Sequence, residues 1–145
     1  MTNAMTQASY VRELTMFALR RKGKCFVGWT PQIVFRFIAF HLLAGTLFIA
    51  REGRALLGVG VAFPCHAAWA VEHGKEPFKW VLPEQGNTLF ISDVVVSTRR
   101  AVPMLWKQAL NKWPWISHVS MMHRGRMIEL HLRQMEQLTG GCYGR

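Results

Sequence analysis

The sequence predicts one α/β domain, and three observations support this class. Apolar residues near the N-terminus recur at helical spacing. Residues 46–63 change to the pattern of two strands around a turn. Residues 87–133 then give, in order, a strand, a helix and a hairpin. A chain of 145 residues has the usual size of one domain, so we expect residues 1–145 to share a single core.

Two helices are predicted within residues 6–45. The first carries an apolar stripe that includes Leu14 and Phe17, and Gly23 ends it. The second starts at Thr30–Pro31, a cap residue followed by a proline suited to the first turn. Basic residues at the end of the first helix complement its dipole, with a phosphate site as the alternative interpretation. They are Arg20, Arg21, Lys22 and Lys24.

The middle of the chain is predicted to form a hairpin, 46–63, and an irregular loop, 64–86. In the hairpin, Gly58 and Gly60 remove side chains from one face of a strand. This pattern indicates either a bulge or close approach of a ligand chain, or simply a weak strand. Prolines and charges dominate the loop, with a short helix expected at Ala67–Val71.

The clearest element order lies in residues 87–133, and residues 134–145 are left as a tail. The expected elements are the strand Thr88–Val96, a helix opened by Pro103, and the strands Ile116–Met122 and Met127–Leu132. Asp93 interrupts the first of these strands. An unpaired carboxylate is costly in such a place, so we expect Asp93 to pair with an arginine or to face a cleft.

Charge and cysteine content narrow the classes of partner and compartment. Eighteen lysines and arginines against eight acidic residues give a formal charge of +10, which favours an acidic protein, nucleic acid, anionic lipid or phosphorylated cofactor as partner. The three cysteines are far apart and form no CxxC pair, so we expect neither a disulfide framework nor a zinc site. The same cysteine pattern fits a reducing compartment, so we expect a cytoplasmic protein. We expect no stable membrane insertion, because Arg36 would lie inside the most apolar helix.

The order of elements resembles the GNAT superfamily of N-acetyltransferases. This resemblance implies a GNAT-like domain with a mixed, mainly antiparallel central sheet flanked by helices. In that superfamily a loop with the signature Q/R-x-x-G-x-G/A binds the pyrophosphate of acetyl-CoA through its N–H groups. The corresponding segment here, 96–104, has no glycine at the signature positions. The resemblance places the donor phosphate near Arg99, Arg100, Ala101 and Val102; the alternative is that the two arginines are solvent-exposed charges at a helix start.

Two narrower resemblances carry different functions. The stretch Leu89–Asp93, followed by a loop and a helix, looks like the aspartate-bearing strand of the RTX toxin-activating acyltransferases, which take acyl groups from acyl carrier protein. Asp93 would then be the essential aspartate. That family's catalytic histidine precedes the first apolar helix, whereas the first histidine here, His41, falls inside it. Small size and basicity also resemble phage internal virion proteins with an acetyltransferase-like fold, which need not catalyse a reaction.

Two hypotheses therefore stand. The first is a GNAT-like N-acyltransferase that uses acetyl-CoA or acyl carrier protein, with Asp93, His118 and His123 as candidates for the base that deprotonates the amine. Structural packing is the alternative role for each of them. His118, His123 and His131 form no HxH or HExxH pair, so no metal is expected. The second hypothesis is a non-catalytic phage or mobile-element protein, located in the host cytoplasm or virion, that binds an acidic partner or nucleic acid.

Overall fold

The protein has a five-stranded mixed sheet with helices on both faces. The computed structural model describes residues 3–21, 26, 28–76, 81–123 and 125–134. The elements are α1 (Asn3–Arg20), α2 (Pro31–Ala44), β1 (Leu47–Glu52), β2 (Ala55–Cys65), α3 (Ala67–His73), β3 (Thr88–Val96), α4 (Ala101–Lys112), β4 (His118–His123) and β5 (Arg126–His131). The predicted α/β class and the helix-flanked mixed sheet are confirmed. Lys22, Gly23, Lys24, Cys25, Cys142 and all of the tail except Gln134 lie outside the described residues.

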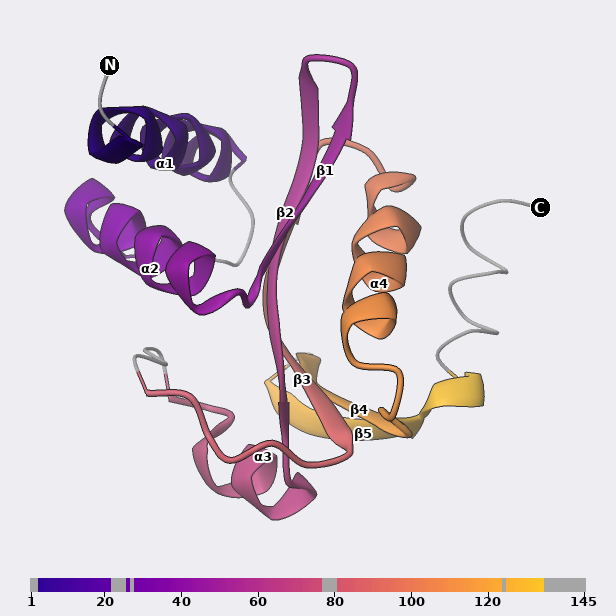
Figure 1. Ribbon diagram of the computed structural model, residues 1–145. Coiled ribbons are helices and arrows are strands. Elements are labelled where there is room, and N and C mark those ends of the chain that lie inside the picture. Colours follow the sequence, from indigo (N-terminus) through magenta and orange to yellow (C-terminus); the bar gives the residue numbers. More distant parts are fainter. Residues whose placement is uncertain (1–2, 22–25, 27, 77–80, 124, 135–145) are drawn as a thin grey trace.

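The strands lie side by side in the order in which they occur along the chain. Neighbours are antiparallel, with the exception of β3 and β4, which are parallel. A parallel pair needs a crossover connection, and α4 supplies it. Figure 1 shows α1 and α2 on one side of the long strands and α4 on the other. The sheet therefore separates two apolar cores.

The first core lies beneath α1 and α2. Thr30 caps α2 by accepting a hydrogen bond from the Ile33 N–H, Pro31 opens the helix, and Gly45 ends it with a positive φ of 77°. Side chains of β2 that point to this face include Val59 and Phe63. Among the described residues, no helix is long and apolar enough to cross a membrane.

The second core lies beneath α4, and two glycines allow that helix to pack closely. A Cβ added at Gly58 would lie 3.0 Å from the Ala101 Cβ, and one added at Gly60 would lie 3.5 Å from Leu105 Cδ1. The sequence left open a bulge, a ligand approach or a weak strand at these positions. The structure shows an extra residue, Leu57, in β2 beside Gly58, and both glycines accommodate α4 of the same chain.

α4 begins two residues earlier than the sequence predicts, at Ala101 and not at Pro103. The N–H of Ala101 donates to the Thr98 carbonyl and that of Val102 to the Arg99 carbonyl. These bonds close a turn before Pro103, so the helix begins at Ala101. Proline still fits there because the first-turn N–H groups of a helix lack partners within the helix.

Candidate functional site

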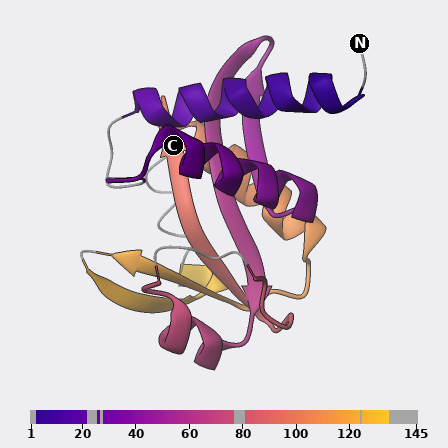
Figure 2. The ribbon, with the colours of Figure 1, turned by 90° about the vertical axis from the view of Figure 1, so that its left-hand side faces the viewer.

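The sheet opens between its two parallel strands. β3 and β4 pair along four residues, from Thr88 with His118 to Ile91 with Met121. Beyond this point β3 continues beside β2 as far as Val96. Figure 2 shows β3 following β2 while β4 and β5 turn away from it. The two parallel strands therefore form a V whose closed end is this short ladder.

A bulge in β3 coincides with the opening. Val61 of β2 faces Asp93, but the next residue, Ala62, faces Ile91, so Ser92 is an extra residue in β3. The insertion changes which side chains point to each face. Ile91 packs in the core beneath α4, whereas Val95 packs in the core beneath α1 and α2.

Asp93 follows the bulge and faces the α1 and α2 side of the sheet. It borders a small space together with Phe37 and Ile38 of α2 and Ala18 of α1. The Ser92 hydroxyl donates to its carboxylate at 2.6 Å. The aspartate that interrupts an apolar strand is thus half-buried beside the split, on the sheet face opposite α4.

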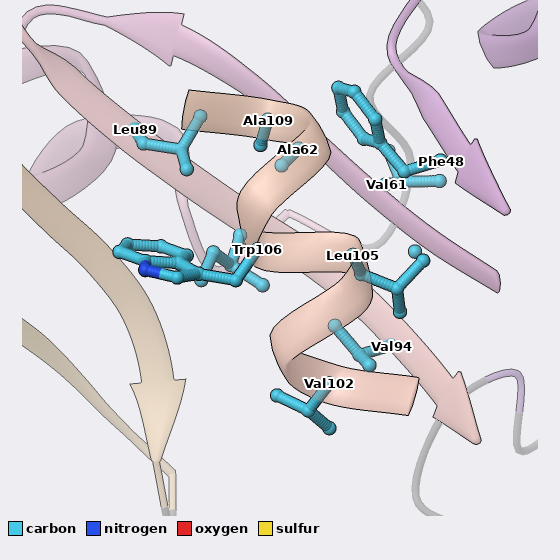
Figure 3. Close-up of a pocket in the computed structure, with 11 residues that line it drawn as sticks. Phe48, Val61, Ala62, Leu89, Val94, Val102, Leu105, Trp106 and Ala109 are labelled. Atoms are coloured by element: carbon cyan, nitrogen blue, oxygen red, sulfur yellow. The ribbon is translucent and has the colours of Figure 1, made fainter. Parts of the chain in front are cut away.

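An apolar cavity of about 60 Å³ lies between α4 and the sheet, beside the split. Figure 3 shows side chains from successive turns of α4 directed into it, together with side chains of β3. Its lining is hydrocarbon apart from the Trp106 indole N–H. The lining residues are Phe48, Gly60, Val61, Ala62, Leu89, Ile91, Val94, Val102, Leu105, Trp106 and Ala109. A cavity of this size and lining suits a short alkyl group, because it offers dispersion contacts and no strong polar group.

The arginines expected near a donor phosphate lie at the start of α4. Arg99 and Arg100 are exposed, and Arg100 forms an ion pair with Glu52 of β1 at 3.2 Å. The N–H groups of Ala101 and Val102 already donate to carbonyls of the preceding turn. At these positions, the guanidinium groups and not these two N–H groups are the donors exposed to solvent.

The structure separates two of the three candidate catalytic residues. His118 faces Thr88 across the ladder, five residues before Asp93 in β3, a separation of roughly 16 Å along the strand. Its Nδ1 lies 2.8 Å from the Ser117 hydroxyl, and its ring packs edge-on against that of His131 at 5.1 Å. The backbone of His123 ends β4 at the open side of the V, and its side chain lies outside the described structure.

His41, the first histidine in the sequence, is a core residue. It is fully buried, and its Nδ1 lies 2.7 Å from the Thr46 hydroxyl. Its ring stacks on that of Phe63, with 6.1 Å between ring centroids and an interplanar angle of 6°. These contacts join the end of α2 to β2 and explain a polar residue within an apolar helix.

Sequence reasoning did not identify the cavity. Its α4 residues are Val102, Leu105, Trp106 and Ala109, spaced at i, i+3, i+4 and i+7, which is the spacing of an ordinary packing face. The same face borders filled core elsewhere on α4, so the spacing alone does not reveal an unfilled space. Within the described residues, no group of three or more His, Cys, Asp or Glu side chains is placed to hold a metal ion.

Cys65 is a buried thiol, and burial raises its pKa to about 11, with a smaller contribution from Glu129. We expect native Cys65 to react with iodoacetamide at pH 8 roughly a hundredfold more slowly than in the unfolded chain, because the thiolate is the nucleophile. Peptide-resolved mass spectrometry measures both rates. Since the pKa is higher in the folded state, the thiol stabilises the fold below about pH 9, and this contribution is lost as the pH rises toward about 11. Equal rates in the two states would contradict the burial.

No protein-family model matches this chain, and a search of curated proteins finds no significant match. The functional assignment therefore depends on the split sheet, the apolar cavity and the charges at the start of α4.

Proposed function

We propose that this protein is a divergent GNAT-like N-acyltransferase, which transfers an acyl group from acyl carrier protein or CoA to an amine. The observation that carries this proposal is the apolar cavity between α4 and the sheet, beside the split of β3 and β4. Ligand sites are concave and mainly apolar. A cavity with this lining is suited to the acyl chain of a thioester donor.

Two arginines at the start of α4 support the proposal, because they can bind the phosphate of the acyl donor and so orient it. Arg99 and Arg100 precede Val102, which is one of the cavity residues. A donor phosphate beside these guanidinium groups would direct the attached arm along α4 toward the cavity. The dipole at the N-terminus of α4 adds to the attraction for an anion.

The same region favours carrier protein over CoA as the donor. CoA carries a pyrophosphate, and the backbone N–H groups of Ala101 and Val102 that would hold it are already bonded. The arm of a carrier protein carries a single phosphodiester, for which side-chain guanidinium groups suffice. A chain with a formal charge of +10 also favours an acidic carrier surface.

In the proposed reaction, the amine nitrogen attacks the thioester carbonyl carbon. The new C–N bond forms as the C–S bond breaks, the donor leaves as a thiol, and a base takes the proton of the amine. The acyl chain lies on the α4 face, while Asp93 lies beside the split on the opposite face. We propose that the acceptor amine enters from the Asp93 side and meets the donor carbonyl within the opening, with Asp93 as its base.

The test is calorimetric titration of the protein with butyryl carrier protein, unacylated carrier protein and acetyl-CoA. We expect the acylated carrier to bind most tightly. Val102→Trp, which places an indole in the cavity, should weaken that binding at least tenfold. Lys107→Trp, an exposed position on the same helix, is the matched control and should change it less than twofold.

Catalysis is tested separately from donor binding. We expect Asp93→Asn to bind the acylated carrier as the parent protein does and to lose acyl transfer to an amine acceptor, measured by mass spectrometry. If neither carrier protein nor CoA binds, the proposal is wrong. If Asp93→Asn transfers the acyl group at the parental rate, Asp93 is not the base.

A second candidate is a non-catalytic phage or mobile-element protein on the same scaffold, which binds an acidic partner or nucleic acid. The observation that favours it is that, among the described residues, no acidic or basic side chain lines the cavity. In that case the titrations would show salt-sensitive binding of polyanions without acyl transfer.

A further inference from the structure

A groove of about 380 Å³ lies between α1 and the start of β2, on the sheet face opposite the apolar cavity. Figure 2 shows α1 lying across β1 and β2 below the tip of their hairpin. The groove is lined by Glu13, Met16, Phe17, Arg20 and Arg21 from α1, and by Arg54 and Leu56 from the hairpin. Two elements distant in the sequence thus bring three arginines to one concave surface.

None of these three arginines, Arg20, Arg21 and Arg54, forms an ion pair with a carboxylate in the part of the chain that the structure describes. The one carboxylate in the lining, Glu13, forms an ion pair with Arg51 and raises the pKa of that guanidinium. The groove is therefore strongly positive.

The C-terminal end of α1 does not cancel this positive charge. The helix dipole places the equivalent of about half a negative charge at a C-terminus, and Arg20 and Arg21 both lie there with full positive charges. The favourable interaction with the helix dipole explains part of the positive charge at Arg20 and Arg21. It does not account for Arg54, which comes from the hairpin turn.

The groove also has an apolar floor and an oriented donor. The Arg21 guanidinium lies over the Phe17 ring, 4.4 Å from the ring centroid. A guanidinium stacked in this way keeps its in-plane N–H groups available at the edge for an anion. Met16, which is 45% exposed, and Leu56 supply apolar surface beside the charges. The ligand should therefore combine a compact anion with an apolar body.

From these features we propose that the groove binds a phosphate ester of a small organic molecule, with the phosphate among the three arginines and the organic part over Met16 and Leu56. Several guanidinium groups match the several oxygens of a phosphate. A space of this size falls in the range of small-molecule sites, roughly 300 to 1,000 Å³. The site lies across the sheet from the cavity and does not depend on the proposed acyl transfer.

The test uses calorimetry on the full chain with two phosphate esters, adenosine monophosphate for an aromatic body and octyl phosphate for an aliphatic one. We expect at least one to bind saturably and at least about tenfold more tightly than inorganic phosphate or adenosine. The ester that binds identifies the preferred body. If neither ester binds at about 5 mM, or if adenosine binds equally well, the proposal is wrong.

Charge-matched variants separate a built site from general attraction. Arg54→Gln and Arg21→Gln should each weaken binding about fivefold or more. Arg12→Gln removes the same charge from an exposed position of α1 outside the groove and should change the affinity less than twofold. Equal losses in all three variants would overturn the proposal. Val102→Trp, on the other face, should leave ester binding unchanged, so failure of the acyltransferase assignment and failure of this site are distinguishable.

Discussion

Replacing Phe63 by alanine is expected to lower the free energy of unfolding by about 4 kcal/mol. Phe63 is 1% exposed, and its ring contacts three others from separate elements. Those rings are His41 of α2, Trp69 of α3 and Phe90 of β3, with centroids 6.1, 5.6 and 5.5 Å away. Truncation removes all three contacts and leaves a cavity that the rigid sheet cannot close.

Urea denaturation followed by circular dichroism measures this loss. A change of this size is a large fraction of the roughly 5 to 15 kcal/mol by which a domain is stable. Val71→Ala is the control, because Val71 is 72% exposed on α3 and surface truncations usually cost less than about 0.5 kcal/mol. A cost for Phe63→Ala as small as that of Val71→Ala would show that the ring does not join these elements.

Replacing Gly58 by valine is expected to cost about 2 to 3 kcal/mol and to weaken binding of the acyl donor. A Cβ at this position already lies 3.0 Å from both the Ala101 Cβ and Val96 Cγ1. Because the Ala101 Cβ is fixed to the backbone of α4, we expect the strain to move the start of α4 away from the sheet. That movement changes the wall of the cavity and the position of Arg99 and Arg100 together.

Alanine substitutions at Gly58 and Gly60 compare how much stability is lost at a close and at an ordinary contact with α4. Gly60→Ala places its Cβ 3.5 Å from Leu105 Cδ1, an ordinary contact, whereas Gly58→Ala retains the 3.0 Å approach. We therefore expect Gly60→Ala to unfold at a higher urea concentration than Gly58→Ala, with Gly58→Val the least stable of the three. If Gly58→Val matches Gly60→Ala in both stability and donor affinity, α4 does not depend on close packing at Gly58.

Periodicity and turn chemistry were sufficient to predict most of the fold. The cap at Thr30–Pro31, the helix end at Gly45 and the two hairpins are local signals, and the structure contains each of them. Sequence also predicted the strand around Asp93 within its observed bounds. Local signals of this kind depend on neighbouring residues, so they can be read without knowledge of the tertiary structure.

Hydrophobic periodicity in the sequence does not predict the β-bulge that sets the direction of Asp93. The bulge at Ser92 adds one residue to β3, and one residue is enough to move every later side chain to the other face. Without it, Asp93 would point toward α4 and the apolar cavity. The four-residue ladder between β3 and β4 is likewise a tertiary property. This ladder, not the order of elements, places His118 far from Asp93.

The short ladder between β3 and β4 also divides the sheet into two cooperative units of unequal strength. Long antiparallel ladders join β1, β2 and β3, whereas β4 and β5 are attached to them through four residue pairs, through packing against α4 and through Met127, which packs against the first core. Local unfolding costs least where the fewest bonds and contacts must break. We therefore expect the β4–β5 hairpin to be the first part of the sheet to detach, while the long ladders of β1, β2 and β3 stay intact.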